Sequence, residues 1–110
     1  MELNDYQTRA HATSLNVEIG GDWLLYPVLG LLGEAGEIAN KVKKIHRDNG
    51  GGITLEQALE LRKELGDVLW YVAELATQLG TTLDFVAHDN LLKLADRAER
   101  GTLKGSGDDR

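Results

Sequence analysis

The sequence predicts an all-α fold, a helical bundle of about four helices. Four segments carry apolar residues at the helical spacing of three or four positions, and each has residues that favour helix termini at its ends. No segment shows the strict alternation of apolar and polar residues that is typical of a strand. The chain has 110 residues and no linker-like interruption, so we expect a single domain over residues 1–110.

The first helix is expected at about 5–15 and the second at about 27–47. Asn4 can cap the first helix, with Gln7 in the capping-box position. Pro27 suits the first turn of the second helix, because its missing N–H needs no partner there. The second helix has an apolar stripe made of Val28, Leu31, Leu32, Ala35, Ile38, Val42 and Ile45.

The third helix is expected at about 55–80, after a flexible break at 49–52 that contains three glycines in a row. Thr54 caps this helix, and Gln57 completes a capping box. The apolar stripe of the third helix is Leu61, Leu65, Val68, Val72, Leu75 and Leu79.

The fourth helix is expected at about 83–100, with Thr81 or Thr82 as its cap. Residues 101–110 contain three glycines and no apolar periodicity, so we expect a flexible tail. Several apolar residues of the fourth helix are left over for self-association, namely Phe85, Leu91, Leu92 and Leu94.

Composition excludes several classes of function. The net charge is −6, which argues against nucleic-acid polymers and anionic membranes as partners because no basic patch dominates. The chain has no cysteine, so it lacks a disulfide framework, a thiol nucleophile and a zinc–thiolate site. It also lacks an apolar run of membrane-spanning length and a secretion signal pattern. We expect a soluble cytoplasmic protein.

Two pairs of acidic residues have the same three-residue step, Glu34 with Glu37 and Glu64 with Asp67. In a helix this step puts both side chains on one face, where like charges repel. The second and third helices, if antiparallel, bring the two pairs face to face. A cation between the pairs would relieve the repulsion, and magnesium or manganese prefer such oxygen ligands.

Ordinary solvated positions are the alternative interpretation of these acids. A solvated helix face usually carries Lys or Arg four residues after an acid, but of the four acids only Glu37 has such a partner, Lys41. We therefore expect a partly buried site without local charge compensation. A ferritin-like di-iron site needs Glu-x-x-His, and none of His11, His46 and His88 follows these acids by three positions.

Glycines stand inside both acid-bearing helices, at Gly30, Gly33, Gly36 and Gly66. Each interior glycine costs about 0.5–1 kcal/mol relative to alanine. We expect close helix packing at these positions, which would also bring the carboxylates within reach of shared metal ions.

The stretches at 30–37, 63–71 and 105–110 read GLLGEAGE, KELGDVLWY and GSGDDR. Together with the 26-residue gap between the acid pairs, they resemble the MazG-like family of all-α nucleoside triphosphate pyrophosphohydrolases. The resemblance covers nearly the whole chain. It extends to the first helix through Tyr6, Gln7, Ala10 and Thr13, and to the last through 90–94 and Arg97.

The resemblance implies hydrolysis of a nucleoside triphosphate to the monophosphate and pyrophosphate, with Mg²⁺ as cofactor and Mn²⁺ as a substitute. Glu34, Glu37, Glu64 and Asp67 would hold the metal. Many relatives carry an additional glutamate where this chain has Gly33. The general base is therefore left open between Glu34 and Glu37.

Aromatic residues are candidates for contact with the nucleoside. Tyr71 follows Asp67 by four positions and should share the acid face, although a core or interface role is an equal alternative. Trp23 is a candidate for stacking on the base. Trp70 is expected at a helix or subunit interface.

Cationic and amide side chains near the end of the chain are further candidates for substrate binding. By the resemblance, Asn90 and Lys93 contact sugar and phosphates. Three cations, Arg97, Lys104 and Arg110, are further candidates to close on phosphates. A solvated surface is the alternative interpretation for each of them.

The expected partner is a ribo- or deoxyribonucleoside triphosphate, and the expected role is control of the nucleotide pool. Proteins that the chain resembles form homodimers or homotetramers with pockets near or across subunit contacts. Two alternatives stay open: a non-catalytic helical binding module, and a nucleotide or metal sensor that binds without turnover. The sequence does not fix the base, the sugar, the number of metal ions or the number of subunits.

Overall fold

A computed structural model describes residues 1–110 as four α-helices without a named strand, which confirms the all-α prediction. The helices are α1 (Leu3–His11), α2 (Leu25–Asn49), α3 (Leu55–Gln78) and α4 (Leu83–Arg100). None of them is both long enough and apolar enough to cross a lipid bilayer.

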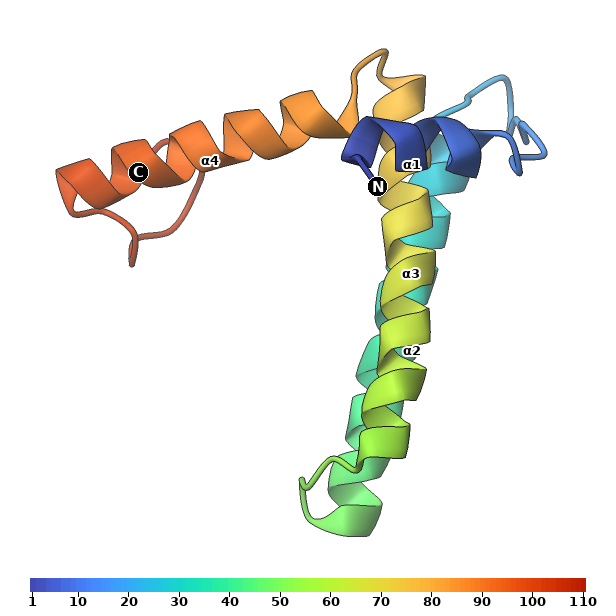
Figure 1. The fold of residues 1–110 in the computed structure, drawn as a ribbon, viewed down its shortest axis with the longest axis vertical. Helices are drawn as coiled ribbons and strands as arrows, with labels where there is room; N and C mark the ends of the chain where they lie inside the picture. The colour runs from blue at the N-terminus through green and yellow to red at the C-terminus, as the bar shows by residue number, and fades with distance from the viewer.

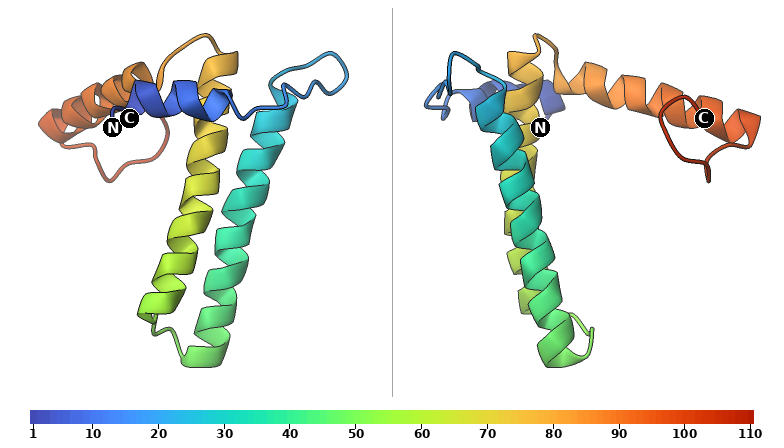
Figure 2. Two further views of the ribbon diagram at one scale, coloured as in Figure 1. Left: turned by 45° about the vertical axis from the view of Figure 1, so that its right-hand side comes forward. Right: turned by 180° about the vertical axis from the view of Figure 1, so that it is seen from behind.

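The long helices α2 and α3 lie side by side as an antiparallel hairpin, and α1 lies across the end of that hairpin (Figure 1). The fourth helix leaves this end and points away from the hairpin, so the chain has the outline of a bent arm (Figure 2). Only the beginning of α4 meets α1 and α3, and α2 packs against α3 alone.

The first helix departs most from its predicted bounds, and the ends of α2 and α3 differ from theirs by at most two residues. It ends at His11 rather than at residue 15, and Asn4 lies inside it rather than at its cap. Asn4 Oδ1 instead accepts a hydrogen bond from the backbone N–H of Asp84 at 3.0 Å. The Gln7 side chain also leaves its expected capping role and binds the turn before α4, accepting from the N–H of Leu83 at 2.7 Å. Residues of α1 thus fix the start of α4.

The other helix ends follow from local chemistry. The predicted capping box of Thr54 and Gln57 is confirmed at the start of α3, and Thr82 caps α4 through the N–H of Phe85. Pro27 lies in the first turn of α2. Gly50 follows the last residue of the same helix and caps it, and its φ of +67° is the left-handed conformation that glycine adopts without strain.

The core is small and lies where α1, α3 and α4 meet. Ala10, Ala73, Ala76 and Leu83 form its buried cluster. Glu74 is 4% exposed beside it, and its Oε1 lies 2.7 Å from His11 Nδ1. Nine of the 110 residues are buried. A single chain therefore leaves most of its apolar surface open.

The exposed apolar residues gather on the hairpin and on α4. On the hairpin they include Val28, Leu29, Leu32, Val42, Leu59, Leu65 and Leu69. On α4 they are Phe85, Val86, Leu91, Leu92 and Leu94. Large apolar side chains left exposed along whole helices are typical of a chain that binds a partner.

Candidate functional site

Three of the four predicted acids meet across the hairpin. Glu34 comes from α2, and Glu64 and Asp67 come from successive turns of α3. One carboxylate oxygen from each lies within 4.8 Å of the others. The three-residue step from Glu64 to Asp67 and the antiparallel packing of α2 on α3 together produce this cluster, and the fourth predicted acid, Glu37, lies outside it. We call Glu34, Glu64 and Asp67 the acid cluster.

Glu37 lies one turn further along α2 and is exposed. It is not among the three residues whose oxygens converge. Its negative charge still reaches the cluster, because it contributes to the raised pKa of Glu34. A ligand role for Glu37 stays a prediction.

Negative charge is concentrated in the acid cluster. Partial burial, followed by the charges of Asp67 and Glu64, raises the pKa of Glu34 above its ordinary value. One cation partly neutralises this charge, because Lys41 Nζ lies 2.9 Å from Glu64 Oε1. The expectation that the acids have no charge compensation is therefore wrong for Glu64. The error arose because Lys41 was paired along its own helix with Glu37, whereas the structure pairs it across the hairpin.

A pocket of about 370 Å³ opens beside the acid cluster, lined by Thr13, Glu34, Asp67, Trp70 and Tyr71. Tyr71 thus lies near the acids, as its spacing from Asp67 suggested. The Trp70 indole N–H donates to Thr13 Oγ1 at 2.9 Å and joins the α1–α2 connection to α3. The pocket therefore combines carboxylates with two aromatic walls.

Sequence reasoning missed Trp70 and Thr13 as pocket residues. Trp70 was expected at a helix or subunit interface, and it does pack against the core between α1 and α3. It also follows Asp67 by three positions, the same step that pairs the acids. That spacing was a usable signal. Thr13 lies 57 positions from Trp70, and no local pattern connects the two.

Close packing explains one of the four glycines in the hairpin. A Cβ atom on Gly30 would overlap the Tyr71 ring, which in turn packs edge-on against Trp70 with ring centroids 5.0 Å apart. By contrast, nothing lies within 4 Å of a Cβ at Gly33, Gly36 or Gly66. The prediction of close packing at these three positions is therefore wrong within one chain.

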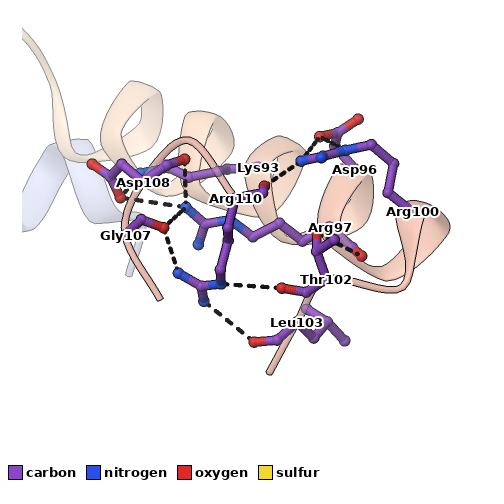
Figure 3. A network of polar contacts seen from close by, with 9 residues as sticks. All are labelled: Lys93, Asp96, Arg97, Arg100, Thr102, Leu103, Gly107, Asp108 and Arg110. Carbon is purple, nitrogen blue, oxygen red and sulfur yellow. Dashed lines mark hydrogen bonds and ion pairs between the residues drawn. The ribbon is translucent and has the colours of Figure 1, made fainter. Parts of the chain in front are cut away.

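The remaining candidate substrate residues lie away from the acid cluster. Lys93 and Arg97 on α4 bind the Asp108 carboxylate of the tail, and Arg110 binds backbone carbonyls of the same tail (Figure 3). Asn90 is an exposed residue of α4, and Lys104 of the tail. One chain alone does not join these residues to the acids.

Trp23 borders a different hollow, lined by His11, Asn16, Thr77 and Gln78. The tail, residues 101–110, contains no helix or strand and folds back along α4. Its flexibility stays a prediction.

Comparisons with known proteins converge on one family. The family model described as the MazG nucleotide pyrophosphohydrolase domain matches residues 24–102, which contain the whole acid cluster. The chain is also similar to the Gene 37 protein of Mycobacterium phage L5, with 50% identity over 114 residues that cover 100% of both chains. No solved structure matches the chain.

Proposed function

Because the chain belongs to the MazG nucleotide pyrophosphohydrolase family, we propose that it hydrolyses ribo- or deoxyribonucleoside triphosphates to the monophosphate and pyrophosphate. The convergence of three carboxylates beside an aromatic pocket is the observation that supports this reaction. Control of the nucleotide pool is the proposed role, with the cytoplasm as its place.

The chemistry of the acid cluster suits a magnesium ion. All its ligand atoms are oxygens, which hard divalent cations prefer. The cluster already holds one cationic group, the Lys41 ammonium. We propose that Glu34, Glu64 and Asp67 bind Mg²⁺, or Mn²⁺ in its place, with Glu37 as a further ligand. The metal would supply positive charge to the triphosphate and acidify a nearby water.

The side chains around the pocket would orient the nucleotide and move one proton. Water attacks the α-phosphorus, the bond from this phosphorus to the α–β bridging oxygen breaks, and pyrophosphate leaves. Glu34 or Glu37 accepts the proton that the water loses. The rings of Trp70 and Tyr71 would hold the nucleoside, because they form the apolar walls nearest to the carboxylates.

A second copy of the chain would complete this site. The apolar faces of the hairpin and of α4 are open in a single chain, and small helical domains gain burial by oligomerising. We propose a homodimer or homotetramer in which α4 of one copy brings Asn90 and Lys93 toward the acids of another. Sedimentation should give a dimer or tetramer at micromolar concentration, and a stable monomer would contradict this arrangement.

A panel of canonical and modified triphosphates tests the reaction, with magnesium and then manganese, and with chromatography of every product. Monophosphate and pyrophosphate in equal amounts support the proposal and rank the substrates. Orthophosphate as the sole released product would contradict cleavage at the α-phosphorus. Nucleotide binding without any product would identify a sensor. Neither binding nor product, from a chain whose helical fold is verified, would favour a helical binding module.

A further inference from the structure

Trp70 and Thr13 line two hollows at once. The first is the pocket beside the acid cluster. The second has a volume of about 360 Å³, and its other lining residues are Met1, Tyr6, Arg9 and Ala10. The Trp70 indole is therefore a wall of the acid-cluster pocket and also borders a second space into which it has room to turn.

A chain of two hydrogen bonds ties the Trp70 ring to α1. The Thr13 hydroxyl donates to the backbone carbonyl of Ala10 at 2.7 Å, and its oxygen accepts from the Trp70 indole N–H at 2.9 Å. A hydroxyl has one proton and an indole nitrogen can only donate, so each group has the partner that its chemistry allows. Because Ala10 belongs to the buried cluster, this chain is anchored in the core.

The other contacts of the Trp70 ring are aromatic or apolar. The Tyr71 ring lies at 82° to it, with centroids 5.0 Å apart, and the ring also packs on the buried cluster. Burial of apolar area has no preferred direction, so these contacts fix the position of an indole more than the direction of its N–H. The Thr13 hydroxyl is therefore the contact that selects this orientation of the ring.

We propose that Thr13 is a positioning residue for nucleotide binding, whose hydroxyl holds the Trp70 indole in the orientation that forms one wall of the acid-cluster pocket. The inference rests on the proposed function, because it takes this pocket as the place of the nucleoside. The effect passes through the Trp70 N–H and leaves the carboxylates in place. Its loss should therefore raise KM, while kcat keeps its value.

Steady-state hydrolysis of dATP, dCTP, dGTP and dTTP with magnesium tests the effect on KM. Thr13→Val removes the hydroxyl at an exposed position, so the core keeps its packing. For the best of the four substrates, KM should rise about two- to tenfold, the effect of one net hydrogen bond, with kcat within about twofold of the wild type. Thr13→Ser retains the hydroxyl and should restore the wild-type KM. An unchanged KM in Thr13→Val would overturn the proposal.

A double-mutant cycle separates the positioning of Trp70 from direct contact between Thr13 and the nucleotide. Trp70→Phe keeps an aromatic ring without an N–H, so adding Thr13→Val to it should leave KM unchanged. An equal rise of KM in both backgrounds would overturn the proposal, because Thr13 would then act without Trp70. Thr8→Val is the matched control. It removes an exposed hydroxyl that donates within α1, to the Asn4 carbonyl at 3.1 Å, and should keep the wild-type KM.

The indole N–H signals in NMR spectra report the same hydrogen bond without any nucleotide. The chain has two tryptophans, and Trp23→Phe assigns their signals. Thr13→Val should shift the Trp70 signal and leave that of Trp23, which borders a different hollow. A Trp70 signal that Thr13→Val does not move would overturn the proposal.

Failure of this inference is distinguishable from failure of the proposed reaction. A chain that binds the four deoxynucleotides without hydrolysing them contradicts the reaction, and the same cycle is then read in the Kd from calorimetric titration. Hydrolysis with a KM that does not depend on Thr13 leaves the reaction standing and overturns the inference. A chain that binds none of the four also overturns the inference.

Discussion

The α2–α3 hairpin and α4 with its tail differ in how far their charges are neutralised within the chain. On the hairpin, three carboxylates converge and a single lysine, Lys41, answers them. On α4, Lys93 and Arg97 converge, and the chain supplies its own anion, Asp108, together with backbone carbonyls. One region holds excess negative charge, and the other has its positive charge matched internally.

This difference indicates which region is suited to bind an ion from solution. Like charges on adjoining helices are tolerated when a cation lies between them, so the hairpin is suited to bind a metal ion from solution. The cations of α4 already have an anion from the same chain, the Asp108 carboxylate of the tail. The two regions are complementary in charge, yet one chain points them apart (Figure 1).

Of the substitutions that test this comparison, Asp67→Asn should have the largest effect, a loss of hydrolytic activity. The substitution removes one carboxylate from the acid cluster, and losing several kcal/mol of charge stabilisation lowers the rate about 100-fold or more. Pyrophosphate release measures the loss. The melting temperature should stay unchanged or rise slightly, because repulsion from Glu34 disappears.

Glu60→Gln is the control for Asp67→Asn, since Glu60 is an exposed acid on the same helix but outside the acid cluster. It should retain near wild-type activity. Equal losses in the two variants would contradict a special role for the acid cluster.

Gly30→Ala tests the aromatic packing beside the acids. The added Cβ would overlap the Tyr71 ring, and overpacking typically costs about 1–3 kcal/mol, which exceeds the gain in helix propensity of about 1 kcal/mol. We expect a net loss in the free energy of unfolding, measured by urea denaturation. A more stable variant would show that Tyr71 moves aside without cost.

Gly33→Ala is the counterpart on the open side of the same helix. In a single chain the Cβ meets nothing within 4 Å, so the variant should gain about 0.5–1 kcal/mol from helix propensity. A second copy packed closely against this face would reverse the sign. Denaturation measured over a range of protein concentrations distinguishes the two cases.

Lys41→Gln removes the one cation that answers the acid cluster. The variant should bind Mg²⁺ about two- to fivefold more tightly, because the metal no longer competes with a partly exposed ion pair of modest strength. Calorimetric titration without nucleotide measures this change. Weaker metal binding would mean that Lys41 positions Glu64 rather than competing for it.

The pH dependence of the tail is the smallest expected effect. Since the folded pKa of Asp108 is lowered from 3.8, its ion pairs contribute fully above that value and are lost as the pH falls through the lowered pKa. The tail signals in NMR spectra should therefore be constant between about pH 5 and 8. A transition near pH 6.5, where histidine titrates, would contradict this assignment.

Features that depend on residues close in the sequence could be predicted from it. Apolar periodicity located four helices, and the capping box of Thr54 and Gln57 involves residues only three positions apart. The acid cluster was visible for the same reason, because a three-residue step fixes which side chains share a helix face. The antiparallel hairpin then needed only a short connection between α2 and α3.

Contacts between residues far apart in the sequence could not be predicted in this way. The partner of Asn4 lies 80 positions away at Asp84, and that contact helps to set the direction of α4. Lys41 had two acids within reach, and only the packing of α2 on α3 selects Glu64 over Glu37. Sequence reasoning therefore did not show that a single chain holds α4 apart from the acids.

The central claim is that the acid cluster serves attack of water at the α-phosphorus. Hydrolysis of dATP with magnesium in ¹⁸O-labelled water, analysed by mass spectrometry, tests it most directly. The account predicts one ¹⁸O atom in dAMP, none in pyrophosphate, and negligible product from Asp67→Asn. Label in pyrophosphate or orthophosphate, or full activity in Asp67→Asn, would contradict it.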